Sequence, residues 1–176
     1  MTRTTYYTAA SLDGFLVDSD NSLEWLLHRK SDEQGPMGLD PFIESIGAIA
    51  MGANTYQWII DYHPDAWAYK APVWVFTHRD LTAAPGRDIR FTTESVPAVY
   101  EQMAAAAGDK DLWGMGGGDL AGQFADHGLL DEIIVSFAPV TLGAGAPLLP
   151  RRRELKLTEV AMNGEFACAR YQVLPD

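Results

Sequence analysis

The sequence predicts an α/β protein built on a mostly parallel β-sheet that is flanked by helices and ends in an antiparallel hairpin. The first observation is that short apolar runs alternate with helical patterns as far as residue 128. The second is that polar residues rarely interrupt these runs, as is typical of strands buried on both faces. Such an alternation predicts parallel strands joined by helices. The third is that strand patterns follow one another after residue 131 with little helix between them.

Pattern and propensity place the individual elements along the chain. In chain order they are a strand (4–10), a short helix (23–27), a second short helix from 40, a strand (46–51), a helix (54–60), an aromatic loop (61–70), strands (72–77 and 89–93), a helix (95–107), a strand (111–115), a helix (120–127) and strands (132–140, 154–161 and 166–174). Ser22 and Asp40 are expected to cap the two short helices. Asn163-Gly164 predicts a hairpin between the last two strands.

Length and charge restrict the class of protein. The chain has 176 residues, so residues 1–176 are expected to form one domain with a full core. Its 13 basic and 24 acidic residues give a formal charge of −11, which repels nucleic acid and anionic membranes. The N-terminus lacks the apolar run of a signal peptide, and no run of about 18 apolar residues occurs. We therefore expect a cytoplasmic protein without nucleic-acid or membrane partners.

Three consecutive glycines, Gly116, Gly117 and Gly118, stand between a predicted strand and a predicted helix. Without Cβ atoms the backbone can approach a ligand closely, and the free N–H groups of a helix N-terminus suit a pyrophosphate. The alternative is a tight turn in which Asp119 caps the helix. The spacing differs from the common dinucleotide-binding fingerprint, because Asp119 occupies the place of its third glycine.

Two further segments end predicted strands in the same way. Gly52 precedes a helix that begins near Asn54, and Thr77-His78-Arg79 follows a buried strand with a hydroxyl, an imidazole and a guanidinium. Ligands of open α/β sheets gather at the carboxyl ends of the parallel strands, so all three segments are expected to face one cleft. The alternative for His78 and Arg79 is an ordinary solvated loop.

The sequence contains no recognisable metal or serine-hydrolase motif. The four histidines are scattered without metal-ligand spacing, and no G-x-S-x-G elbow occurs. Cys168 is the one cysteine, which excludes an internal disulfide, and its alternating surroundings predict a small core residue on a strand.

Taken together, the motifs resemble the dihydrofolate reductase-like superfamily, and within it they are most similar to the C-terminal reductase domain of the riboflavin biosynthesis enzyme and its stand-alone relatives. The resemblance covers almost the whole chain. The motifs that carry it are, in order, residues 10–15 (ASLDGF), 51–56 (MGANTY), 75–77 (VFT), 116–120 (GGGDL), 128–132 (GLLDE) and 139–145 (PVTLGAG).

This resemblance implies a sheet of about eight strands that binds a reduced nicotinamide dinucleotide, usually NADPH, in an extended conformation. It implies that Ala10 and Leu12 contact the nicotinamide end. It also implies a pyrophosphate between two helix N-termini, formed by Gly52, Asn54 and Thr55 on one side and by Gly116, Gly117, Gly118, Asp119 and Leu120 on the other. Thr77, His78 and Arg79 would lie beside the adenosine ribose.

One position departs from the family pattern. An arginine that often follows the Met-Gly pair is Ala53 here, so a strong phosphate clamp is missing. Arg79 or His78 can compensate, which favours NADPH, with NADH as the alternative.

The implied reaction is hydride transfer to a C=N or C=O carbon of a small-molecule substrate of the pterin, pyrimidine or flavin pathway type. A proton must also be delivered. In the folate reductases a carboxylate on the helix before the Met-Gly strand helps to supply it, and Asp40 and Glu44 occupy that region here. Asp13 is the leading candidate, although an Asp-Gly turn also explains it. The contrasting hypothesis is a nucleotide-binding or assembly protein that has lost its acid.

The C-terminal hairpin also suggests an assembly. Its strands carry apolar residues at both alternations, whereas an antiparallel edge normally has one polar face. Relatives often form homodimers, and we expect a homodimer with this end of the sheet near the interface. Cover from within the same chain is the alternative.

Overall fold

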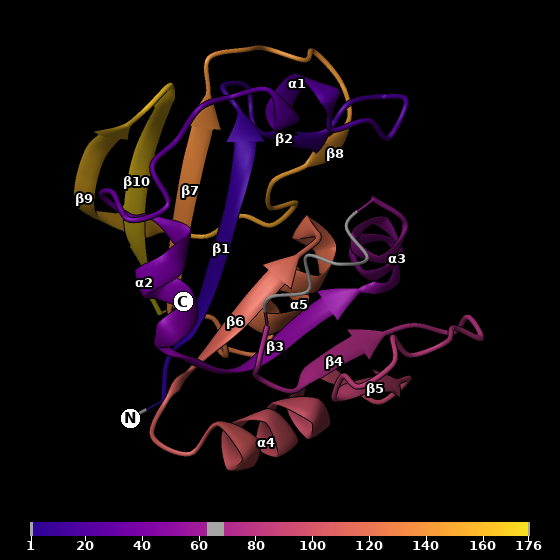
Figure 1. Cartoon of the computed structure of the whole chain (residues 1–176). Helices are drawn as coiled ribbons and strands as arrows, with labels where there is room; N and C mark the ends of the chain where they lie inside the picture. The colour runs from indigo at the N-terminus through magenta and orange to yellow at the C-terminus, as the bar shows by residue number, and fades with distance from the viewer. Residues whose placement is uncertain (1, 63–68, 176) are drawn as a thin grey trace.

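An eight-stranded sheet forms the centre of the computed structural model, which describes residues 2–62 and 69–175 (Figure 1). In spatial order its strands are β5 (Ile89–Thr92), β4 (Val73–Phe76), β3 (Ile46–Gly52), β6 (Asp111–Gly116), β1 (Thr4–Ser11), β7 (Glu132–Ala138), β10 (Phe166–Val173) and β9 (Leu155–Asn163). The strands from β5 to β7 pair in parallel, whereas β10 is antiparallel to both β7 and β9. The predicted fold class is therefore confirmed.

Helices cover the parallel part of the sheet. They are α1 (Glu24–Leu27), α2 (Leu39–Glu44), α3 (Ala53–Tyr62), α4 (Val96–Ala107) and α5 (Gly118–Asp126). A second, two-stranded sheet pairs β2 (Phe15–Val17) with β8 (Ala146–Pro147). The sequence did not predict these two strands, because segments of three and two residues are too short to show a periodic pattern.

Two apolar layers explain why the parallel strands are apolar without alternation. Ala48 and Ala50 of β3 face the layer that contains α4 and α5. Their neighbours Ile49 and Met51 face the layer that contains α3. Successive side chains of a strand point to opposite faces, so a strand buried on both faces needs apolar residues at every position.

The two short helices begin differently from the prediction. The N-cap of α2 is Gly38, not Asp40, and it makes no side-chain cap hydrogen bond. The Asp40 carboxylate lies in the first turn, where it accepts a hydrogen bond from Gln34 Nε2 at 2.5 Å. The backbone N–H of Asp40 donates to the Glu33 carbonyl, and the helix starts two residues earlier than a cap at Asp40 predicts. Leu23 is the N-cap of α1, and the Ser22 hydroxyl accepts from the Glu24 N–H at 3.1 Å.

The hairpin prediction is confirmed. Asn163 pairs with Phe166, and Gly164 has a φ of 58°, a left-handed conformation that favours glycine. The Asn163 side chain is buried and bonds the loop before α2: its amide donates to the carbonyls of Asp32 and Pro36 and its oxygen accepts from the Asp32 N–H.

The predicted aromatic loop over residues 61–70 lies mostly outside the described residues, since α3 continues to Tyr62 and residues 63–68 are not described. Within the described ranges, no helix combines the length and the apolar character needed to cross a membrane.

Gly47 provides a test of the packing between β3 and α4. A Cβ atom built on Gly47 would lie 2.7 Å from Ala107 Cα and 2.8 Å from the Ala107 carbonyl oxygen. We expect Gly47→Ala to lower the free energy of unfolding by about 1–3 kcal/mol, because backbone atoms must move to make room. Denaturant unfolding measures this change.

The matched control lies on the neighbouring strand β6. A Cβ on Gly114 would lie 3.8 Å from the Thr5 carbonyl oxygen, an ordinary contact, so Gly114→Ala is expected to change stability by less than about 1 kcal/mol. Equal losses in both variants would contradict the packing argument.

Candidate functional site

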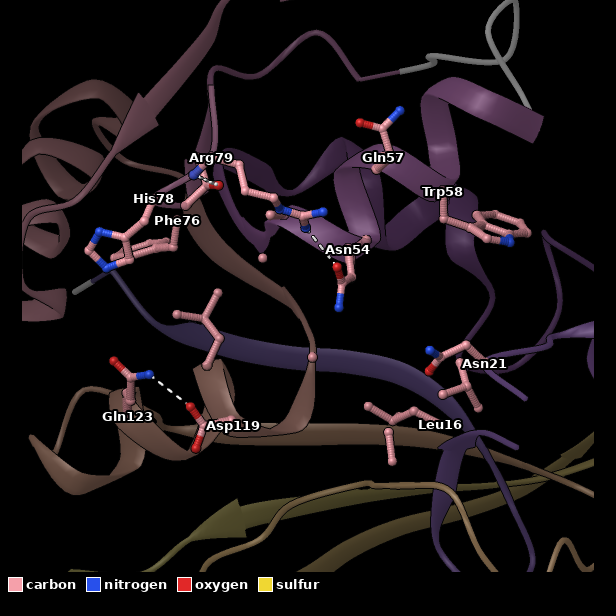
Figure 2. Close-up of a pocket in the computed structure, with 18 of the residues that line it drawn as sticks. Leu16, Asn21, Asn54, Gln57, Trp58, Phe76, His78, Arg79, Asp119 and Gln123 are labelled. Atoms are coloured by element: carbon pink, nitrogen blue, oxygen red, sulfur yellow. Dashed lines mark hydrogen bonds between the residues drawn. The ribbon is translucent and has the colours of Figure 1, made fainter. Parts of the chain in front are cut away.

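A cleft of about 860 Å³ opens at the carboxyl ends of β3, β4 and β6 (Figure 2). Of the residues predicted to bind a dinucleotide, it is lined by Gly52, Asn54, Thr55, Thr77, His78, Arg79, Gly117, Asp119 and Leu120. The three predicted segments therefore meet in one cleft, because parallel strands end at the same edge of the sheet.

Two helix N-termini point into this cleft. The helix α3 starts directly after Gly52, and α5 starts at Gly118, two residues after β6 ends. Because β3 and β6 are adjacent, with Met51 beside Gly116, the two helices begin close together. The N-cap of α5 is Gly117, with no side-chain cap, so Asp119 is not the cap. First-turn N–H groups and the helix dipole favour an anion at such a place.

The three consecutive glycines, Gly116, Gly117 and Gly118, have different structural roles. Gly116 has a φ of 120°, which makes it the residue that turns the chain out of the strand. A Cβ on Gly118 would lie 2.3 Å from the Pro147 carbonyl oxygen, so this glycine allows close packing of two backbones. Gly117 alone of the three lines the cleft, and a Cβ there would lie 3.9 Å from Leu16 Cδ1. Gly116 and Gly118 thus serve the turn and its packing, Gly117 is open to the cleft, and phosphate binding by the triplet stays a prediction.

One end of the cleft holds the guanidinium of Arg79. The Arg79 guanidinium donates a 2.7 Å hydrogen bond to Asn54 Oδ1, which holds it near the start of α3 (Figure 2). The Arg79 N–H donates to Thr77 Oγ1 at 2.9 Å, so the strand end fixes the backbone of this turn. His78 lies beside Phe76 at the same end. Such a guanidinium suits a phosphate group.

On the α5 wall, Asp119 takes part in a polar network. Its carboxylate accepts from Gln123 Nε2 at 2.9 Å and from the Arg151 guanidinium at 3.0 Å. These two hydrogen bonds, the one from Gln123 foremost, lower the pKa of Asp119, so the group is ionised at neutral pH. Arg151 also bonds Asp126 at 2.8 Å, and Arg153 pairs with the same carboxylate.

The other end of the cleft is apolar and aromatic. Leu16 and Asn21 face Trp58 across it, and Trp58 stacks on Tyr62 with ring centroids 5.5 Å apart (Figure 2). None of these residues was predicted from the sequence. Trp58 follows Asn54 by one helical turn, a spacing that could have indicated it. Leu16 gave no signal, since its place depends on the pairing of β2 with β8. Asn21 lies in the turn after β2, where its N–H donates to the Asp18 carbonyl.

Asp13 lies outside the lining of the cleft. Its carboxylate accepts from Ser11 Oγ at 2.6 Å and from the N–H groups of Leu142 and Gly143 at 3.0 and 2.7 Å. These hydrogen bonds, led by that of Ser11, lower the pKa of Asp13 to about 2. The carboxylate therefore joins the loop after β1 to the loop after β7.

Other predicted residues also lie away from the lining. Ala10 is buried within β1, and the exposed Leu12 donates its N–H to the Val140 carbonyl. Asp40 contacts the loop before α2. Glu44 precedes β3, at the end of the strand opposite the cleft, and borders a separate cavity of about 230 Å³. The structure thus brings none of the three candidate acids into the cleft.

No group of three or more His, Cys, Asp or Glu side chains arranged to hold a metal ion occurs in residues 2–62 and 69–175. Cys168 is buried on β10, with its Sγ 3.3 Å from Ser136 Oγ. This agrees with the predicted core position of the cysteine.

Comparison with known proteins supports the same fold. A model of the RibD C-terminal domain matches residues 4–165. The uncharacterized protein YwjB of Bacillus subtilis (strain 168) is 26% identical over 181 residues, which cover 96% of this chain and 97% of YwjB. The structure of a putative riboflavin biosynthesis protein from Shewanella sp. PV-4 superposes with a TM-score of 0.83 at 22% identity, covering 99% of this chain and 100% of that one.

A bifunctional relative is longer. The diaminohydroxyphosphoribosylaminopyrimidine deaminase/5-amino-6-(5-phosphoribosylamino)uracil reductase of Thermotoga maritima matches with a TM-score of 0.68 at 14% identity, covering 98% of this chain and 57% of its own. The match over residues 4–165 includes every strand that borders the cleft. This chain, with its dihydrofolate reductase-like fold, therefore belongs to the family of the RibD C-terminal domain.

Proposed function

We propose that this protein is an NADPH-dependent reductase that transfers a hydride to a C=N or C=O carbon of a small pterin-, pyrimidine- or flavin-pathway-like substrate. The observation that carries the proposal is the convergence of two helix N-termini, the open Gly117 and the Arg79 guanidinium on one cleft. Membership in the RibD C-terminal domain family supports the same reaction class.

The residues between the two helices fit a pyrophosphate. Gly52 and Gly117 have no side chains, and Cβ atoms built on them would meet neighbours at no less than 3.7 Å, so this space is open to a ligand. Asn54 and Thr55 add polar groups in the first turn of α3. Main-chain N–H groups of both helices would hold the phosphate oxygens.

Arg79 is proposed to select NADPH over NADH. Asn54 already holds its guanidinium, so little side-chain freedom is lost when a phosphate binds. The Arg79 guanidinium would bind the phosphate in place of the arginine that often stands at position 53 in the family. Thr77 and His78 would contact the adjacent ribose.

The aromatic end of the cleft is proposed to receive the nicotinamide and the substrate. NADPH, when bound, supplies the hydride. Leu16 and Trp58 would hold the two rings against each other and exclude water, which aligns the reacting carbons. Contacts of Ala10 and Leu12 with the nicotinamide remain part of this proposal.

A second candidate function depends on whether an acid in the cleft can supply the proton that hydride transfer requires. A carboxyl group with a pKa of about 2 is ionised at neutral pH, so Asp13 suits a positioning role better than proton donation. Asp40 and Glu44 lie outside the cleft lining. This arrangement favours, as the second candidate, a nucleotide-binding protein without reductase activity.

The experiment that separates the two is a fluorescence titration with NADPH, followed by assays of NADPH oxidation with a panel of C=N and C=O substrates. Binding with turnover supports the reductase. Binding without turnover on any substrate supports the second candidate. If NADPH does not bind, both are wrong.

Gly117 tests the phosphate site. We expect the Kd for NADPH to rise at least about tenfold in Gly117→Val and by less in Gly117→Ala, because a larger side chain fills more of the space for the phosphates. The φ of Gly117 is −74°, so these variants should fold and melt near the native temperature. A loss of thermal stability with unchanged affinity in the folded fraction would show that this glycine is only structural.

Arg79 tests cofactor selection. A hydrogen bond to a charged group contributes roughly 1.5–3 kcal/mol, so Arg79→Ala should weaken NADPH binding at least about tenfold and NADH binding much less. Arg87→Ala is the matched control, since it removes the same charge from an exposed loop outside the cleft lining. Equal losses for NADPH and NADH in Arg79→Ala would place this residue away from the ribose phosphate.

Asp13→Asn tests the positioning role through pH. The folded state lowers the pKa of Asp13, so its stabilising effect is present above the ordinary value of 3.8 and is lost as the pH falls toward about 2. The melting temperature of the variant should therefore lie below that of the native protein at pH 7, and the gap should close near pH 2. A gap that does not change with pH, together with lost turnover and unchanged NADPH affinity, would instead assign proton delivery to Asp13.

A further inference from the structure

The N-terminus of α5 stays open although an acidic side chain stands in its first turn. The Ala121 N–H donates to the Gly117 carbonyl at 3.1 Å. The three N–H groups before it, those of Gly118, Asp119 and Leu120, have no acceptor among the residues that the structure describes. A carboxylate in the first turn is attracted to such groups by the helix dipole and can accept hydrogen bonds from them. In the structure the Asp119 carboxylate accepts none of these bonds.

Two other side chains bind both oxygens of the Asp119 carboxylate. Oδ2 accepts from Gln123 Nε2 at 2.9 Å, and Oδ1 accepts from the Arg151 guanidinium at 3.0 Å (Figure 2 shows the first bond). Gln123 lies one turn further along the same helix. The carboxylate is therefore held along the side of α5 and not over its N-terminus.

The sequence of α5 explains how Arg151 reaches this carboxylate. Asp119, Gly122 and Asp126 follow one another by three and four residues, so they share one face of the helix. The Arg151 side chain crosses this face at Gly122, where a built Cβ would lie 2.9 Å from Arg151 Cγ. Its guanidinium therefore bonds Asp126 at 2.8 Å as well as Asp119 at 3.0 Å. Arg151 itself does not line the cleft.

Asp119 differs from the other two carboxylates in the lining of the cleft, Asp61 and Glu94. Each of the three accepts a hydrogen bond from a glutamine side chain. Within the described residues, Asp119 is the one of the three that also pairs with an arginine. It is also the one that stands in the turn after Gly117, where a negative charge would compete with a bound phosphate.

We propose that Arg151 is a positioning residue for cofactor binding: it keeps the Asp119 carboxylate from occupying the N–H groups of α5 and so leaves them to the pyrophosphate of NADPH. This inference rests on the proposed function of the cleft. Without the guanidinium, the carboxylate would turn to the first-turn N–H groups, where it competes for the donors and repels an anion.

A double-mutant cycle on Arg151 and Asp119 tests this coupling. The Kd for NADPH, measured by isothermal titration calorimetry, should rise at least about fivefold in Arg151→Met. In the Asp119→Ala background the same change should alter the Kd by less than about twofold, because no carboxylate remains to be positioned. Arg152→Met is the matched control, since it removes the same charge from a side chain that is 93% exposed and pairs with Glu154. Its Kd should stay within about twofold of the native value.

A purely structural role of Arg151 gives a different result. The hydrogen bond from Arg151 to Asp126 holds the loop before β9 on α5 whether or not residue 119 is acidic. An equal rise of the Kd in the native and Asp119→Ala backgrounds would therefore overturn the proposal, as would an unchanged Kd in Arg151→Met. Circular dichroism verifies the fold of each variant, and Arg151→Gln is measured by the same criteria if Arg151→Met does not fold.

Inorganic pyrophosphate, titrated as a second ligand, separates this inference from the proposed function. If the native protein binds pyrophosphate with the same coupling but does not bind NADPH, the cofactor assignment is wrong and the role of Arg151 toward an anion at α5 stands. If NADPH binds without the coupling, the proposed cofactor stands and the role of Arg151 is wrong. If neither ligand binds, both are wrong.

Discussion

The parallel pairing of β3 with β6 is the constraint on which the cleft depends. Both strands run in the same direction and end side by side, with Met51 next to Gly116. Each is followed within two residues by a helix, so two sets of free N–H groups point into the same space. Had the two strands been separated by another, a single phosphate group could not reach both helices.

That pairing also requires small residues. Gly47, Ala48 and Ala50 on β3 allow the flanking helices to approach the sheet. The segment that contains Pro147 and Leu148 passes so close to Gly118 that no side chain fits between them. The Tyr6 hydroxyl donates to the Leu148 carbonyl at 2.9 Å, and the Leu148 N–H donates to the Gly14 carbonyl. This one segment therefore connects the first strand, the loop after it and the start of α5.

The sheet could be predicted from the sequence because its physical signals are local. Strands buried on both faces are apolar throughout, and Asn163-Gly164 specifies its own turn. The prediction was less accurate for helix starts, since Gly38 is the N-cap where Asp40 was expected, and Gly117 is the N-cap where Asp119 was the alternative. The β-bulge in β9, where Arg170 pairs with Glu159 but Tyr171 pairs with Leu157, could not be predicted. Apolar residues occupy both odd and even positions of this strand, so the sequence does not show where the register shifts.

In the candidate site, too, the residues with a local signal could be predicted and the others could not. Residues next to strand ends, such as Asn54 and Arg79, gathered in the cleft as predicted, because the end of a parallel strand defines their place. Gly116, Gly117 and Gly118 are identical in sequence, and only their surroundings assign one to the cleft, one to a turn and one to packing. Leu16 reaches the cleft through the pairing of β2 with Ala146 and Pro147, which no local pattern predicts.

The central place of β1 affects how the chain acquires its structure during synthesis. The strand β1 is synthesised before β6 and β7 and lies between them, so Thr4 finds its neighbours only when Leu112 and the strand from Glu132 have been made. Until then its apolar positions stay exposed, since distant contacts form late and local helices cannot replace them. A nascent chain that stalls before residue 138 would therefore present β1 to chaperones or to aggregation, and the completed C-terminal half acts as the template on which the N-terminus is placed.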